Sequence, residues 1–255
     1  RMIHWPDSMF TYLNEDQILF SSDGFGQHYA GPERFDDQIG DAIMVHAKKY
    51  FANILLLYVP LIKKYLQNVI DSGMEINMIC PDHGVIWRKN PAKIVEAYAR
   101  WCEQVPERKA VVIYDTMWHS TEKMANAVVS GINQEGVAAK PFHLRKTHRS
   151  EIMLEVFDAG AVVIGSPTLN NQLFPTLADF LTYMKGLKPL NKIGAAFGSY
   201  GWSGEAVKMI NQELEAMKFD IVDPGLRVQY VPDRDSLESC YELGRRIGKA
   251  VAGSV

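Results

Sequence analysis

The second half of the chain alternates short apolar runs with helical patterns, and this alternation constrains the fold more than any other feature. Apolar and β-branched runs predict strands at residues 111–116, 137–144, 159–166, 192–199 and 226–231. Helical periodicity predicts helices at residues 121–134, 150–157, 177–187, 204–217 and 236–251. Strands that alternate with helices predict a doubly wound α/β domain with a five-stranded parallel sheet.

The composition excludes several classes of protein. The 255 residues are 47% hydrophobic and 22% charged, which is typical of a globular protein with a sizeable core. A net charge of −3 gives no basic surface, so we expect no nucleic-acid partner. The longest apolar run, residues 51–62, is too short to cross a bilayer, so we also expect no membrane partner.

The cysteines indicate a reducing compartment. Cys80, Cys102 and Cys240 are far apart and odd in number, which argues against a disulfide framework and predicts a cytoplasmic protein. The chain contains no Cys-x-x-Cys pair, so it carries no fused rubredoxin-type iron centre or zinc ribbon.

The first part of the chain follows a less regular pattern. Residues 11–23 predict two short strands with a turn at 14–16, and residues 35–70 predict helix with a break near Pro60. A strand is expected within residues 74–84, and Pro91 begins a helix that runs to about Glu103. Because residues 106–108 have the composition of a linker, we predict domains at 1–106 and 107–255.

Three loops of the second domain follow strands, and ligands of open α/β sheets bind at this edge. Their residues are Thr116, Met117, Trp118, His119, Ser120 and Thr121; Ser166, Pro167, Thr168, Leu169, Asn170 and Asn171; and Ser199, Tyr200, Gly201, Trp202 and Gly204. The first loop combines hydroxyls with a helix N-terminus and predicts a phosphate site, with Thr121 as one donor. The third carries aromatic side chains that can flank a ring. Taken singly, such loops are more often helix caps or packing lids.

The three loops together resemble those of flavodoxin, which hold flavin mononucleotide (FMN). The first strand lacks the Gly-x-Gly-x-x-Gly fingerprint, so we expect FMN rather than a dinucleotide. The first loop departs from the flavodoxin pattern at one position, because His119 stands where flavodoxins have glycine.

Three residues of the first domain are candidate metal ligands. His4, Asp23 and His83 lie in the segments HWPDSM, SSDGFGQH and PDHGVIWR, and imidazole and carboxylate groups suit iron, zinc or manganese. They are far apart in sequence and must converge from different loops. A histidine at a strand end is otherwise a surface or hydrogen-bonding residue, and we assign His46, His143 and His148 to the surface. We expect His28 either behind the metal ligands or on the surface.

As a set, HWPDSM, SSDGFGQHY, YFANIL, PDHGVIWR and the later GSYGWSG resemble the flavodiiron proteins over essentially the whole chain. The resemblance implies a metallo-β-lactamase-like αββα domain with two irons, followed by a flavodoxin-like domain with FMN. It implies that His4 binds one iron, Asp23 bridges both and His83 binds the second. Tyr50 is a candidate hydrogen-bond donor to a bound substrate, although a core tyrosine fits the same pattern.

The resemblance also implies an activity and partners. Flavodiiron proteins reduce dioxygen to water, nitric oxide to nitrous oxide, or both, with electrons that pass from a carrier such as rubredoxin through FMN to the irons. It implies a head-to-tail homodimer or a dimer of dimers. The family's His-x-Glu-x-Asp-His run is absent, so residues 1–106 match only the second half of the metal domain. We therefore expect an upstream segment to carry the remaining ligands.

Two other functions remain open at this stage. One is a flavodoxin-type electron carrier, whose first domain would be only a scaffold. The other is a metallo-β-lactamase-type hydrolase with two zinc ions. Metal and flavin analysis separates all three, whereas the preference between dioxygen and nitric oxide requires turnover with each gas.

Overall fold

A computed structural model describes residues 3–254, which divide into two compact units between Gln104 and Val105. We call residues 3–104 the first unit and residues 105–254 the second unit. The division precedes the segment 106–108, whose prediction as a linker is wrong for Glu107 and Arg108, because these residues begin the first strand of the second unit.

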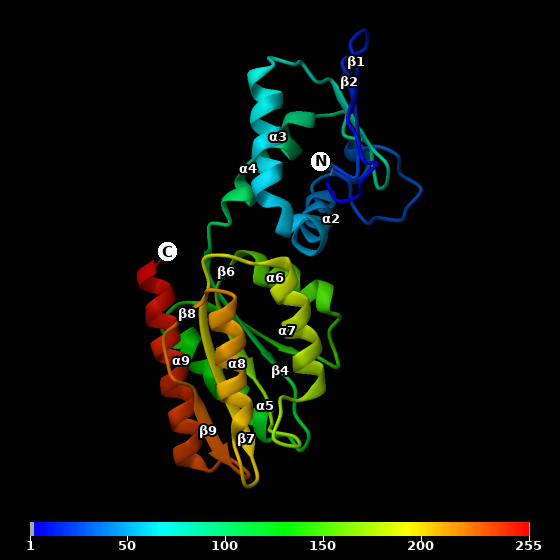
Figure 1. Ribbon diagram of the computed structural model, residues 1–255. Helices are drawn as coiled ribbons and strands as arrows, with labels where there is room; N and C mark the ends of the chain where they lie inside the picture. Colours follow the sequence, from blue (N-terminus) through cyan, green and yellow to red (C-terminus); the bar gives the residue numbers. More distant parts are fainter. Residues whose placement is uncertain (1–2, 255) are drawn as a thin grey trace. The chain divides into compact units, whose positions relative to one another are not determined.

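A parallel sheet forms the centre of the second unit (Figure 1). Its order is β5-β4-β6-β7-β8, and β9 also pairs with β7. The strands are β4 (Glu107–Tyr114), β5 (Ala138–His143), β6 (Ala159–Gly165), β7 (Ile193–Tyr200), β8 (Asp220–Ile221) and β9 (Leu226–Gln229). The predicted parallel α/β fold is therefore confirmed, and the two-residue β8 is an addition to the five expected strands.

Helices lie on both faces of this sheet. They are α5 (Ser120–Gln134), α6 (Arg149–Asp158), α7 (Pro175–Leu187), α8 (Glu205–Ala216) and α9 (Arg234–Ser254). Alternate strand residues such as Val112, Val163 and Ala195 share one core with α5 and α9, as the two-residue period of a strand requires. On the opposite face, Gly194 and Gly198 lie against side chains of α8. The sheet is thus buried on both sides, which explains the continuous apolar run of β6.

The first unit is built on a smaller mixed sheet. β1 (Thr11–Leu13) pairs antiparallel with β2 (Ile18–Ser22), which pairs parallel with β3 (Met78–Pro81). The helices are α1 (Asp36–Ile39), α2 (Ala42–Tyr50), the π-helix η1 (Phe51–Leu55), the 3-10 helix η2 (Leu56–Tyr58), α3 (Val59–Asp71) and α4 (Pro91–Glu103). The helix break expected near Pro60 corresponds to the change from the 3-10 helix η2 to the α-helix α3, which begins at Val59.

The helical stretch Ala42–Asp71 requires a correction to the sequence analysis. By length and composition this stretch is apolar enough to cross a membrane, although no single run of the sequence indicated it. Ten of its side chains are buried within the protein: Ile43, Ala47, Tyr50, Phe51, Ala52, Leu55, Leu56, Val59, Ile62 and Leu66. Because this is the burial pattern of a core helix, we assign the stretch to the core of the first unit.

Candidate functional site

The three predicted loops of the second unit meet around one cavity. The loops follow β4, β6 and β7, whose carboxyl ends share one edge of the sheet. The cavity has a volume of about 400 Å³. Its lining consists of Met117, Trp118, Ser120, Pro167, Thr168, Leu169, Asn170, Asn171, Ser199, Tyr200, Gly201, Trp202, Ser203, Tyr230 and Val231.

Hydrogen bonds connect the loops to one another. The Thr121 hydroxyl lies 2.9 Å from the Ser199 hydroxyl, and the backbone N–H of Thr168 donates to the Ser199 carbonyl at 2.9 Å. The Ser203 hydroxyl donates to Asn171 Oδ1 at 3.0 Å. These hydrogen bonds fix the positions of the three loops around the cavity without a bound ligand.

Exposed aromatic side chains surround the cavity. Trp118 is 84% exposed, Trp202 is 89% exposed and Tyr230 is 66% exposed. Large aromatic rings in water are costly unless they meet a ligand or a partner. Tyr230 was not among the predicted site residues, because the pattern of residues 226–231 indicates a strand. In the structure β9 ends at Gln229 and leaves this tyrosine at the loop edge.

The first loop adopts a glycine-type backbone at His119. The φ angle of this residue is +66°, in the left-handed region, which explains why flavodoxins have glycine here. The side chain compensates, since His119 Nδ1 lies 2.6 Å from Glu122 Oε2 on the first turn of α5. This hydrogen bond lowers the pKa of the Glu122 carboxyl. The departure from the flavodoxin sequence thus leaves the loop conformation intact.

Polar groups of the first loop are available to an anion. The Thr116 Oγ1 atom is buried and has no hydrogen-bond partner among the described residues. The backbone N–H groups of residues 117–120 likewise donate to no acceptor in residues 3–254. A phosphate would satisfy both, because successive N–H groups at a helix N-terminus bind anions. FMN therefore fits this edge.

Several predicted site residues lie behind the cavity wall. Thr121 is fully buried against Ser199 rather than open to the cavity, and its role as a phosphate donor remains a prediction. The buried Ser166 hydroxyl donates to the Pro167 carbonyl and accepts from Phe174 N–H. Gly204 precedes α8 beside the Tyr200 ring. These residues shape the loops.

A buried carboxylate at the start of the first loop was missed by the sequence analysis. Asp115 is fully buried and lies beside His143, whose Nε2 is 3.2 Å from Asp115 Oδ1. The assignment of His143 as a surface residue is therefore wrong, since its side chain is only 11% exposed. His148 is exposed and caps α6, and the His46 ring contacts Tyr29.

In the first unit, the structure brings His4, Asp23 and His83 together. The two carboxylate oxygens of Asp23 face different imidazoles, with Oδ1 3.3 Å from His83 Nε2 and Oδ2 3.5 Å from His4 Nε2. A carboxylate placed between two imidazoles has the donor chemistry for bridging two cations. Each cation would nevertheless receive only one imidazole and one oxygen from these residues.

The loops that carry Asp23 and His83 are joined by Gln27. This buried amide accepts from Val85 N–H at 2.7 Å through Oε1 and donates to the Phe25 carbonyl at 2.7 Å through Nε2. His83 Nδ1 lies 3.1 Å from the Gln27 carbonyl, which orients Nε2 toward Asp23. A metal-binding histidine commonly has its second nitrogen held in this way.

Tyr50 lies beside this cluster. Its hydroxyl is 3.5 Å from His4 Nε2, and its ring centroid is 4.9 Å from that of His83. Burial, and then the charge of Asp23, raise the pKa of Tyr50 well above its usual value, so its hydroxyl stays protonated. The π-helix η1 begins at the next residue, and such turns are frequent at functional sites. His28 also contacts the Tyr50 and His83 rings.

The metal site itself is not formed by the described residues. Within residues 3–254, no three or more His, Cys, Asp and Glu side chains are arranged to hold a metal ion.

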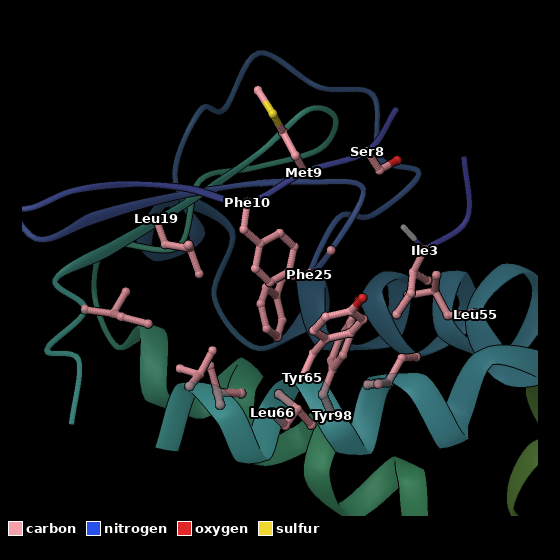
Figure 2. Close-up of a pocket in the computed structure, with 15 residues that line it drawn as sticks. Ile3, Ser8, Met9, Phe10, Leu19, Phe25, Leu55, Tyr65, Leu66 and Tyr98 are labelled. Carbon is pink, nitrogen blue, oxygen red and sulfur yellow. The ribbon is translucent and has the colours of Figure 1, made fainter. Parts of the chain in front are cut away.

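The first unit also contains an apolar cavity. Figure 2 shows that Phe10, Phe25 and Tyr98 converge in it, above α3 and α4. Its volume is about 350 Å³. Trp5, Met9 and Phe20 are also exposed on this unit.

Comparisons with known proteins agree with this architecture. The flavodoxin family profile matches residues 112–244. A nitric oxide reductase of Moorella thermoacetica is 48% identical over 253 residues, 98% of this chain and 63% of the relative. A rubredoxin-oxygen oxidoreductase of Megalodesulfovibrio gigas is 42% identical over 254 residues, again 98% of this chain and 63% of the relative.

Solved structures show the same likeness. Rubredoxin oxygen:oxidoreductase from Desulfovibrio gigas matches with a TM-score of 0.97 and 42% identity, over 100% of this chain and 64% of that one. The flavodiiron protein from Giardia intestinalis matches with a TM-score of 0.92 and 37% identity, over 99% and 63%. The chain thus spans under two thirds of the length of these relatives.

Proposed function

The chain belongs to the flavodoxin family through residues 112–244 and is homologous to flavodiiron proteins over nearly its whole length, and from this premise we propose that it acts as a flavodiiron oxidoreductase. The reaction we propose is reduction of dioxygen to water, of nitric oxide to nitrous oxide, or both. One observation carries the proposal: the same chain holds a flavodoxin-type cavity and a carboxylate between two imidazoles.

FMN is the flavin that we propose for the second unit. The N–H groups of residues 117–120 and the Thr116 hydroxyl supply donors for one phosphate, while Trp118 and Trp202 line the cavity for the ring. Bound FMN would accept electrons from a carrier and release them to the metal centre. The protein contributes the position of the flavin and the exclusion of competing chemistry.

Iron is the metal that we propose for the first unit. His4 and His83 would each bind one of two ions, and Asp23 would bridge them. The two irons would supply open coordination positions for a diatomic substrate, and the electrons for its reduction would reach them from the carrier through the flavin. Tyr50 would hold a proton near the substrate, because its hydroxyl lies 3.5 Å from His4 Nε2.

The partners belong to the same proposal. A rubredoxin or a similar small carrier would donate electrons, and a head-to-tail homodimer or dimer of dimers would bring flavin and metal together between subunits. We further propose a cytoplasmic location. The three thiols agree with a reducing compartment, since Cys80, Cys102 and Cys240 are all free.

A flavodoxin-type electron carrier is the second candidate function. It is favoured by the absence of a three-residue metal cluster among residues 3–254. In that case the protein would carry FMN and exchange electrons without reducing a gas.

One experiment separates these functions. Flavin is extracted and identified, iron is counted per flavin, and consumption of dioxygen and of nitric oxide is measured with reduced rubredoxin. FMN with two irons and gas turnover is the expected result. FMN without stoichiometric iron would establish the carrier function, and a colourless protein with bound zinc would contradict both.

A further inference from the structure

The first loop of the flavin site begins at a carboxylate that is enclosed by the protein. Asp115 follows β4 directly and is fully buried. Its backbone N–H donates to the Gly165 carbonyl at the end of β6, at 3.3 Å. A buried charge persists only when it is paired and hydrogen-bonded. The partners of this carboxylate therefore indicate what it holds in place.

The two oxygens of Asp115 together contact three parts of the unit, and His143 Nε2 also lies 3.2 Å from Oδ1. Oδ1 accepts from Arg145 Nε at 2.9 Å and from the backbone N–H of Thr116 at 2.6 Å. Oδ2 accepts from the Thr176 hydroxyl on α7 at 2.6 Å. The carboxylate thus links the segment after β5, the first loop and the start of α7.

Arg145 holds the same residue of the loop from its other side. Its Nη2 group donates to the Thr116 carbonyl, while Nε donates to Asp115. The backbone N–H and C=O of Thr116 are therefore both bound by this charged pair. Because the N–H belongs to the 115–116 peptide and the C=O to the 116–117 peptide, the pair fixes the orientations of two successive peptide planes. It thereby sets the direction in which the loop leaves β4.

The other end of the loop is fixed independently by the bond between Thr121 and Ser199. Between these anchors, the N–H groups of residues 117–120 remain available, and no acceptor within residues 3–254 engages them. Donors that are already oriented bind an anion without the entropic cost of ordering a loop.

We propose that Asp115 and Arg145 are positioning residues that preset the first loop for the phosphate of FMN, through their paired bonds to the backbone of Thr116. This inference rests on the proposed flavin function. It assigns the pair an effect on the phosphate end of the ligand alone, since neither side chain lines the cavity that contains Trp118 and Trp202.

The test compares FMN with riboflavin, which has the same ring and no phosphate. Dissociation constants for both are measured on the full chain after removal of its flavin, for the wild type and for Arg145→Met. The substitution keeps the aliphatic stem and removes both hydrogen bonds. We expect FMN to bind about tenfold more weakly and riboflavin to bind as in the wild type.

A matched control is Arg149→Met. Arg149 on α6 is exposed to a similar extent, 45% against 51% for Arg145, and pairs with Asp179 and the Tyr183 ring instead of the loop. Both of its dissociation constants should equal those of the wild type. Thr176→Val, which removes the bond to Asp115 Oδ2, should weaken FMN binding alone and by less than Arg145→Met.

Arg145→Lys distinguishes position from charge. It retains the cation but cannot reach Asp115 and Thr116 with a planar fork, so FMN binding should remain below that of the wild type. Full recovery with lysine, unchanged FMN affinity in Arg145→Met, or an equal loss of FMN and riboflavin would each overturn the inference. A wild-type protein that does not prefer FMN to riboflavin would instead contradict the proposed flavin function.

Discussion

Asp115 of the second unit and Asp23 of the first both contact several polar side chains, yet they are held very differently. Asp115 accepts three hydrogen bonds of 2.6 to 2.9 Å and is fully buried. The contacts of Asp23 with Ser8, His4 and His83 are 3.3 to 3.5 Å, and its side chain is 17% exposed. Short contacts consume the lone pairs of a carboxylate, whereas long ones leave them available. The first arrangement suits a structural role and the second a ligand.

Substitution of Asp23 should produce the largest effect. Asp23→Asn removes the charge and one acceptor between the two imidazoles, so we expect iron binding to weaken by more than about tenfold, beyond what a supporting residue contributes. Gas reduction should be lost while FMN stays bound. The measurement is the ratio of iron to flavin in the purified variant.

Asp82→Asn is the control for this experiment, because the Asp82 carboxylate accepts from the Ser22 hydroxyl at 3.0 Å, whereas the imidazoles of His4 and His83 pair with Asp23. It should retain iron. Wild-type iron content in Asp23→Asn would refute the bridging role and remove the contrast with Asp115.

The Gln27 contacts can be broken through Gly84. This residue has φ +83°, and an added Cβ would lie 2.2 Å from Gln27 Oε1. Gly84→Ala should lower the free energy of unfolding of the first unit by about 2–6 kcal/mol, since backbone strain and overpacking each cost about 1–3 kcal/mol. Urea denaturation measures this loss.

Gly136→Ala supplies the matched comparison in the second unit. Gly136 has φ +72°, but its nearest neighbour to an added Cβ is Arg108 Nη2 at 3.5 Å. Only the left-handed backbone is penalised there, by about 1–2 kcal/mol. If Gly84→Ala and Gly136→Ala lower the free energy of unfolding equally, the Gln27 side chain moves away from the added methyl group without destabilising the first unit.

A smaller effect is expected for the ion pairs around Glu155. Burial acts to raise the pKa of Glu155, but hydrogen bonds from Lys140 and Lys109 outweigh it and hold the pKa below the ordinary 4.5. A lowered carboxyl pKa contributes stability that is present above pH 4.5 and is lost as the pH falls through the folded-state value.

Glu155→Gln should therefore lower the free energy of unfolding of the second unit at neutral pH by about 1.5–3 kcal/mol and lessen its decline in acid. Unfolding curves recorded from neutral pH to below 4.5 test this. Glu238→Gln, at an exposed position of α9, should behave as the wild type. If the free energy of unfolding of Glu155→Gln falls with decreasing pH as steeply as that of the wild type, other carboxylates cause the loss.

Trp202→Ala should have the smallest effect and a different selectivity. The exposed indole lines the cavity and has no role in the bonds around Thr116. Loss of ring contact, about 0.5–1.5 kcal/mol, should weaken FMN and riboflavin binding equally, by roughly twofold to tenfold. A loss confined to FMN would place Trp202 at the phosphate end instead.

The order of elements was predictable from the sequence because local chemistry determines it. Apolar β-branched runs became β4, β6 and β7, and Pro91 begins α4 as its restricted φ favours. The three loops then had to meet at one edge, since the carboxyl ends of parallel strands coincide. Strand β8 escaped notice because two residues carry no periodicity.

Only the tertiary structure decided how the polar side chains are used. Asp115 and Gln27 are single residues whose partners are distant in sequence, such as Thr176 and Val85, and no pattern marks them. His143 resembled a surface residue until the fold placed it beside Asp115. The sequence determined which elements form because secondary structure depends on near neighbours. Burial and pairing of charge depend on chain segments that only folding brings together.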